Sequence, residues 1–423
     1  ILILDTWGRA IHTLFFMPAA ALGWSGYRWA ALLASAGTVA ITYLIGKRLQ
    51  IAFAWAIPLL LWFQPWFVVT SFTGITEVTF SLALLAAIYC ALRKSDLMAG
   101  LLFGMLPLIR TEGAGLSVLF FVYCAFRREW KAMALIAGPV VLYNVAGLLG
   151  MGMLPAHVYM NARPISQEQL DMMKFPTGSW GLYPKTLVAY AGPPLMVLML
   201  YGLPMVFRSV ARVLVAIPFT AYFAAHVVIA KFSLFGTGGD WRYILPAAPA
   251  VAIVAAMGLG LLVAQVRDGV QSWLPQLPKP MITVPILFMC LGVVTLYGIR
   301  GSDPLQEDPE QRPAREVAAW LRDAGLASQN LVSTHPWIYY YLPRQVPDML
   351  WSRHPLPAAF PAGTILLWDT HYSEIFGWRR EELEASAEWE LVHADSRPLP
   401  MNPNARFEFL VFRKRASDER SLN

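Results

Sequence analysis

Apolar runs, most of them long enough to cross a lipid bilayer, follow one another through the first 300 residues, and this succession limits the fold more than any other feature. A helix that spans the hydrocarbon core needs about 20 apolar residues. The runs cover 27–46, 51–70, 76–92, 97–110, 113–126, 131–152, 186–207, 210–230, 243–264 and 281–299. Only 14% of the chain is charged, against about 25% in soluble proteins. The sequence therefore predicts a polytopic α-helical membrane protein with about 10–11 transmembrane or interfacial helices.

Three of the apolar segments are short for a bilayer span. Residues 97–110 and 113–126 predict helices that are kinked, tilted or partly re-entrant. Residues 10–24, "AIHTLFFMPAAALGW", predict an interfacial helix that lies along the membrane surface.

Basic residues follow every second apolar run. They are Lys47 and Arg48, Arg93 and Lys94, Arg127, Arg128 and Lys131, Arg208 and Arg212, and Arg267 and Lys279. Cytoplasmic junctions are enriched in Lys and Arg, so these junctions are predicted to be cytoplasmic. The start of the chain, the other junctions and everything after residue 300 are then predicted to lie outside. This placement explains the net charge of +6 without nucleic-acid binding.

The composition changes at residue 300. We expect a transmembrane domain over 1–299, a polar linker over 300–312 and a small extracytoplasmic α/β domain over 313–423. "AREVAAWLRDAG" predicts an amphipathic helix that ends at Gly325. "NLVST", "TILLWD" and "FEFLVFR" predict short strands, and alternating helices and strands are typical of a small α/β domain.

Charged and aromatic residues gather at the junctions predicted to lie outside. These residues are Asp5, Arg9, Glu77, Arg110, Glu112, Asp240, Trp241, Arg242 and Tyr243, with His157, Tyr159, Arg163, Glu168, Asp171 and Lys174 in the long loop 153–185. Ionisable groups at helix mouths are costly unless they are paired or face a wet cavity, so they are functional candidates.

Most of these residues also have a purely structural interpretation. Glu77 is placed to favour a helix N-terminus, and Arg110 could pair with Glu112 across a tight turn. Asp240 is placed to cap the helix that follows, and Arg242 with its aromatic neighbours could anchor the membrane interface. Both interpretations stay open at this point.

A lipid-linked phosphate donor would need this combination of groups at an outer membrane face. Arginine neutralises a phosphate, a carboxylate can accept the proton of an acceptor hydroxyl, and Tyr and Trp can stack on a sugar. A groove between apolar helices would hold the lipid tail, and an outside domain would recognise the acceptor.

Four stretches resemble the GT-C superfamily of polytopic glycosyltransferases, and in particular the bacterial relatives of dolichyl-phosphate-mannose protein mannosyltransferases and the aminoarabinose transferase. They are "DTWGRAIHTLFFMPAAALGWSGYRWAALLASAGTVAITYLIGKRL", "SFTGITEVTFSLALLAAIYCALRK", "LLFGMLPLIRTEG" and "WRYILPAAPAVAIVAAMGL". In the third, Thr111 replaces the proline of the family's Arg-Pro-Glu-Gly run.

The resemblance implies substrate-binding roles for a defined set of residues. These are Arg110, Glu112, Trp241, Arg242 and Tyr243, with Arg242 as the phosphate partner and its aromatic neighbours as the rim. The family's catalytic carboxylate follows a first helix that this sequence lacks, so the base is expected upstream of Ile1. Asp5, Glu77 and Asp240 are the alternatives within the sequence.

We therefore expect a membrane glycosyltransferase that moves a hexose or pentose from a polyprenyl-phosphate donor to a protein, lipid or glycan acceptor. The alternative is a non-catalytic accessory subunit of a membrane complex with partner subunits. A transporter is disfavoured, because transporter sites lie near the bilayer midplane. The resemblance favours the inner membrane of a bacterium.

The sequence assigns no cofactor. A divalent cation is compatible with the family resemblance, because many relatives use one to offset phosphate charge. The histidines of the outer domain, at 335, 354, 371 and 393, have spacings that fit no compact zinc motif. The three cysteines lie in apolar runs and predict buried thiols. No nucleotide-binding motif occurs.

Overall fold

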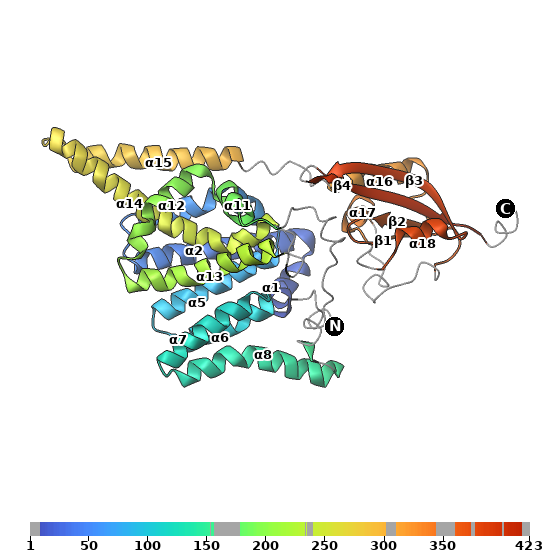
Figure 1. The fold of residues 1–423 in the computed structure, drawn as a ribbon, viewed down its shortest axis with the longest axis horizontal. Helices are drawn as coiled ribbons and strands as arrows, with labels where there is room; N and C mark the ends of the chain where they lie inside the picture. The colour runs from blue at the N-terminus through green and yellow to red at the C-terminus, as the bar shows by residue number, and fades with distance from the viewer. Residues whose placement is uncertain are drawn as a thin grey trace. The chain divides into compact units, whose positions relative to one another are not determined.

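The structure is a computed structural model, and it describes residues 9–152, 154–155, 178–232, 234, 240–301, 310–343, 360–373, 377–399 and 402–416. The chain divides into two compact units, and each is described by itself. The first unit is all helical, and the second combines a sheet with helices (Figure 1).

The first unit contains the apolar helices in the order that the sequence predicts. They are α1 (Ala10–Ala20), α2 (Gly23–Arg48), α3 (Ile57–Trp62), α4 (Pro65–Thr70), α5 (Thr76–Leu92), α6 (Asp96–Ile109), α7 (Gly113–Phe126), α8 (Trp130–Met151), α11 (Leu182–Ala191), α12 (Pro193–Val206), α13 (Val210–Lys231), α14 (Ala248–Trp273) and α15 (Lys279–Gly301), with short 3₁₀ turns η1 (Ala54–Ala56) and η3 (Trp241–Ala247).

Five helical segments of the described chain are long and apolar enough to cross a membrane. They are α2, α8, α13, α15 and the continuous run of η3 and α14, and the bent pair α11–α12 makes a sixth if it counts as one span. Helices α1, α5, α6 and α7 are apolar but shorter. Large apolar side chains face outward, as for Leu142 on α8 and Phe288 on α15. The predicted class, a polytopic α-helical membrane protein, is confirmed.

Two apolar runs that we expected to be single spans are broken. Residues 51–70 form η1, α3 and α4. The second break falls at Pro65, which begins α4 and lacks the N–H that would continue α3. Residues 186–207 bend by 109° between α11 and α12. The bend lies at Gly192, whose φ of +87° is a conformation that side-chain-bearing residues rarely adopt.

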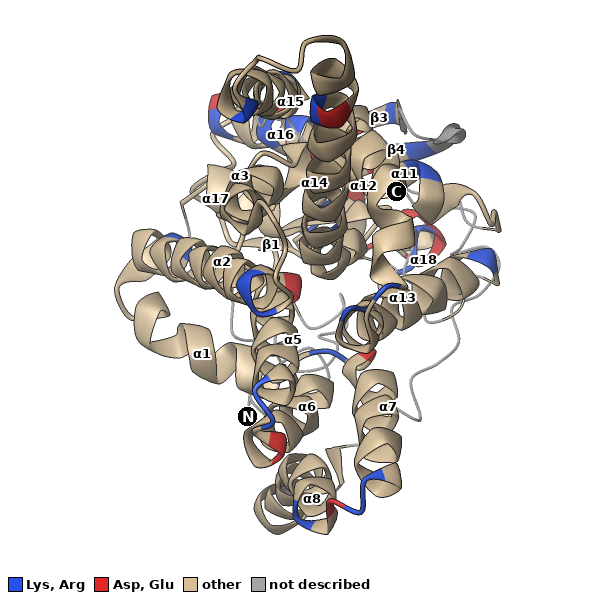
Figure 2. Cartoon of the chain, turned by 90° about the vertical axis from the view of Figure 1, so that its left-hand side faces the viewer, with Lys and Arg blue, Asp and Glu red and all other residues tan. Residues whose placement is uncertain are grey.

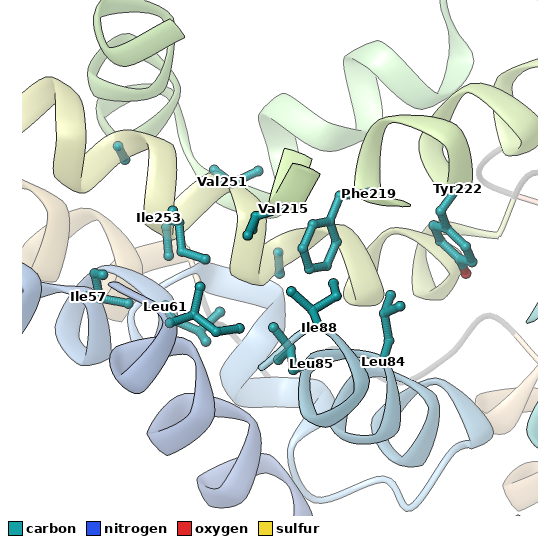
Figure 3. Packing of buried hydrophobic residues seen from close by; sticks show 14 of the residues in the cluster. Ile57, Leu61, Leu84, Leu85, Ile88, Val215, Phe219, Tyr222, Val251 and Ile253 are labelled. Carbon is teal, nitrogen blue, oxygen red and sulfur yellow. The ribbon is translucent and has the colours of Figure 1, made fainter. Parts of the chain in front are cut away.

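The core of the first unit joins helices from several parts of the sequence. Ile57 and Leu61 of α3 belong to one cluster of buried side chains with residues of α5, α13 and α14, among others (Figure 3). Between apolar helices in a bilayer, association depends on close van der Waals packing more than on removal of water. The fit of these side chains is therefore what holds the helices in place.

Helices α12 and α14 approach each other at backbone distance. Gly202 of α12 and Gly258 of α14 face each other, and a Cβ on Gly258 would overlap the carbonyl oxygen of Leu198. Small residues permit such close helix crossings in membranes.

The charged groups of the first unit lie mainly at helix ends and turns, and the helices are uncharged along most of their length (Figure 2). The basic turns meet at one end. Arg212, before α13, donates a hydrogen bond of 3.5 Å to the carbonyl of Leu49, after α2. Arg127, after α7, lies 3.4 Å from Asp96 at the start of α6. The basic junctions that follow every second apolar run therefore lie at the same end of the helix bundle.

The second unit is built on a four-stranded sheet in the order β1-β2-β4-β3. Its elements are α16 (Gln311–Asp323), β1 (Leu331–Ser333), α17 (Pro336–Tyr341), β2 (Ile365–Asp369), α18 (Arg380–Ala385), β3 (Trp389–Leu399) and β4 (Asn402–Lys414). Strands β1 and β2 are parallel, and the other pairs are antiparallel. The predicted α/β character is confirmed, with β3 as a strand that the sequence did not predict.

Candidate functional site

A cluster of ion pairs lies at the helix ends opposite the basic turns. On α5, for example, Glu77 sits in the first turn, whereas Arg93 follows the last. The Glu77 side chain is only 1% exposed. Its Oε1 lies 2.5 Å from Nη1 of Arg110 and 3.5 Å from Nε of Arg242. One carboxylate oxygen therefore contacts two guanidinium groups.

Arg110 is held by the turn between α6 and α7. It leaves the helical conformation at the end of α6, and its carbonyl accepts a hydrogen bond of 2.9 Å from the amide of Gly113. Its guanidinium donates to Glu77, to Thr76 Oγ1 at 3.0 Å and to Glu112 Oε1 at 2.6 Å. The Arg110–Glu112 pair that the sequence allowed as a structural contact is thus present, and Arg110 is engaged on several sides.

Glu112 stays ionised at this turn. Burial opposes its charge, but the Arg110 guanidinium outweighs burial and lowers the pKa of the Glu112 carboxyl to about 2. A carboxylate with so low a pKa is a poor acceptor for the proton of an acceptor hydroxyl, because proton transfer is favoured when the pKa of the base is close to the working pH.

Asp240 and Arg242 form the outer part of the cluster. Asp240 Oδ1 accepts a hydrogen bond of 3.0 Å from the amide of Arg242, which caps the start of η3. Oδ2 of Asp240 lies 3.0 Å from Nε of Arg242. Asp240 therefore does what the structural interpretation proposed, and it also holds the Arg242 side chain. That side chain is 43% exposed, against 9% for Arg110.

The two aromatic neighbours of Arg242 differ in their contacts. The Tyr243 ring lies 4.8 Å from the Arg110 guanidinium and 5.2 Å from that of Arg242, both within cation–π range. Trp241 instead packs on Trp66 of α4, with ring centroids 4.3 Å apart. Tyr243 belongs to the ion-pair cluster, whereas Trp241 ties η3 to its neighbouring helix.

Two further polar residues, which the sequence analysis did not select, face the cluster from α13. His226 Nε2 lies 3.7 Å from Glu112 Oε1, and the His226 ring stacks on Tyr243 at 5.2 Å. Tyr222 lies one turn earlier, with its ring 4.5 Å from that of His226. The available signal was His226, the one histidine inside the apolar run 210–230, because an ionisable residue within a membrane helix is a functional candidate.

Several of the predicted residues lie outside the described part of the chain. Among them are Asp5, residues 156–177 with the polar groups of the long loop, and the glycine-rich residues 235–239 before Asp240. Of the remaining candidates, the structure brings together Glu77, Arg110, Glu112, Asp240, Arg242 and Tyr243.

The charges determine what this cluster can bind. Three carboxylates face two guanidinium groups, so a buried anion would be repelled from the interior near Glu77 and Glu112. Arg242 is the more exposed guanidinium, with Asp240 as a competing partner, so an anion would bind there.

Among the described residues, no group of three His, Cys, Asp or Glu side chains is arranged to hold a metal ion.

Comparison with known proteins gives a match at the level of the fold. The sequence matches no protein-family model, and a search of curated protein sequences gave no match. Two crystal structures of ArnT from Cupriavidus metallidurans, one bound to undecaprenyl phosphate and one in the apo state, resemble the chain with a TM-score of 0.55 and 13% identity. The likeness covers 95% of this chain and 87% of ArnT. The chain therefore shares the fold of ArnT.

Proposed function

We propose that the protein is a membrane glycosyltransferase that moves a sugar from a polyprenyl-phosphate donor to an acceptor at the outer face of a bacterial inner membrane. The observation that carries the proposal is the half-exposed Arg242 at the rim of a buried ion-pair cluster, at the helix ends opposite the basic turns. The fold supports it, since ArnT has been crystallised with undecaprenyl phosphate.

In this proposal, Arg242 binds the donor phosphate by exchanging Asp240 for a phosphate oxygen. Arginine is suited to this role because its guanidinium presents several donors in a fixed plane. Arg110 and Glu77 hold the inner side of the cluster, and the second unit, on the outer face, engages the acceptor. Glu77, Glu112 and Asp240 each pair with an arginine, so we assign none of them the role of general base.

Binding of undecaprenyl phosphate to the purified protein, measured by native mass spectrometry or by thermal shift, tests the phosphate site. We expect Arg242→Ala to weaken binding by roughly 10-fold or more, because a hydrogen bond to a charged group contributes about 1.5–3 kcal/mol. Asp240→Asn should act in the opposite direction, since it removes the competing charge and keeps a capping oxygen. Unchanged affinity in both variants would contradict the phosphate assignment.

Transfer itself is tested with a radiolabelled polyprenyl-phosphate sugar and membranes that contain the acceptors. Sugar incorporation that depends on the protein supports an enzyme. A protein that binds the lipid but transfers nothing, and that purifies with a second membrane protein, would instead support the accessory-subunit alternative.

A further inference from the structure

His226 and Tyr222 carry polar atoms that are buried without hydrogen bonds. Both residues are almost fully buried, His226 at 1% exposed and Tyr222 at 3%. Within the described part of the chain, the two ring nitrogens of His226 and the hydroxyl of Tyr222 have no hydrogen-bond partner. Buried polar groups are nearly always hydrogen-bonded, and each exception calls for an explanation.

The side chains of Tyr222 and His226 lie on the same face of α13. They lie four residues apart on α13, and residues at this spacing share a helix face. The Tyr222 ring packs on Phe80 of α5, and its hydroxyl points away from the apolar residues around it (Figure 3). The face therefore presents a hydroxyl and an imidazole toward the cluster that contains Glu112.

The neighbouring charges select what this face can take. Glu112 is an anion 3.7 Å from His226 Nε2, so a phosphate beside it would be repelled. A neutral group with several hydroxyls is compatible, because it can donate to Glu112 and to an imidazole nitrogen and accept from the tyrosine hydroxyl. The phosphate position at Arg242 is near, since both Arg242 and His226 lie 5.2 Å from the Tyr243 ring centre.

We propose that His226, Tyr222 and Glu112 form a subsite that binds the hydroxyl groups of the sugar carried by the lipid phosphate. This subsite rests on the proposed function and deepens it. The phosphate is held at Arg242, and the sugar lies beside it against the polar face of α13. The arrangement separates recognition of the anion from recognition of the sugar.

The test compares two ligands on each variant. Affinities are measured for undecaprenyl phosphate without a sugar and for undecaprenyl phosphate that carries mannose, glucose or aminoarabinose, and the ratio isolates the sugar. We expect Tyr222→Phe to lower the preference for the best glycosylated lipid by about 3- to 10-fold, the range of one neutral hydrogen bond. His226→Phe, which keeps a ring and removes both nitrogens, should lower it at least as much.

Stability provides the second measurement. Tyr222→Phe should leave the melting temperature of the free protein unchanged or higher, since it removes a buried hydroxyl without a partner. Tyr190→Phe is the matched control, because Tyr190 is also fully buried but its hydroxyl lies 3.4 Å from Thr70 Oγ1. That control should lower the melting temperature and leave the preference for the glycosylated lipid unchanged.

Each outcome has a definite meaning. A preference that is unchanged in Tyr222→Phe and His226→Phe would overturn the subsite, and so would the absence of any preference for a glycosylated lipid in the native protein. In both cases binding of the lipid phosphate itself would still stand. If undecaprenyl phosphate does not bind at all, the proposed function fails, and the subsite fails with it.

Discussion

Replacing Glu77 by Gln should destabilise the first unit strongly, although the two side chains have nearly the same shape. Glu77 is 1% exposed and contacts Arg110, whose side chain is 9% exposed. Removing one partner of a buried ion pair costs about 3–5 kcal/mol, because the remaining charge loses its compensation. Arg110 keeps Glu112 at 2.6 Å, so we expect about 3 kcal/mol, the lower end of that range.

The measurement is unfolding in mixed micelles of increasing SDS content, followed by tryptophan fluorescence. Asp268→Asn is the control, because it also neutralises an acid that pairs with an arginine in the first unit. Asp268 pairs with Arg267 at 2.8 Å, but its side chain is 64% exposed. Exposed pairs contribute little, so this control should be close to the native protein. A Glu77→Gln curve that coincides with the Asp268→Asn curve would refute the view that the cluster is a buried and mutually compensated network.

Two further predictions concern packing and pH. Gly258→Ala should lower the melting temperature, because the added Cβ would overlap the carbonyl of Leu198 and overpacking costs about 1–3 kcal/mol. The control is Gly292→Ala on α15, where a Cβ meets nothing within 4 Å, and this variant should raise the melting temperature slightly. Equal effects of the two substitutions would contradict the close contact between α12 and α14. Glu112 has its pKa lowered from 4.5 to about 2, so its stabilisation is complete above pH 4.5 and is lost as the pH falls toward 2. The melting-temperature difference between the native protein and Glu112→Gln should be constant from pH 7 to 5 and shrink below pH 4.5, and a difference that shrinks already above pH 5 would contradict this.

The positions of the helices were predictable because the bilayer imposes a length on each apolar run. The run 76–92 coincides with α5, and 97–110 differs from α6 by one residue at each end. Breaks inside a run were harder to predict. Residues 51–70 are apolar on both sides of Pro65, and the separation of α3 from α4 depends on the proline together with Gln64, whose amide binds the carbonyl of Ala248 on α14.

The candidate site was predictable where charge stands out at a helix mouth. Glu77, Arg110 and Arg242 are such cases, and the structure brings all three together. Their exact partners were not predictable, since the contacts join positions that lie far apart in the sequence. His226 was missed because one histidine in an apolar run forms no motif. Strand β3 was missed because polar residues and Pro398 interrupt its alternation.

The glycine contact between α12 and α14 has a consequence for how a lipid could reach the site. Side chains at a helix interface can change rotamer and let two helices slide, but Gly202 and Gly258 meet through their backbones. The closest contact between these helices contains no side chain that can change rotamer, so α12 and α14 should move together as a rigid pair. A lateral opening for a polyprenyl tail would therefore have to form between other helices of the bundle.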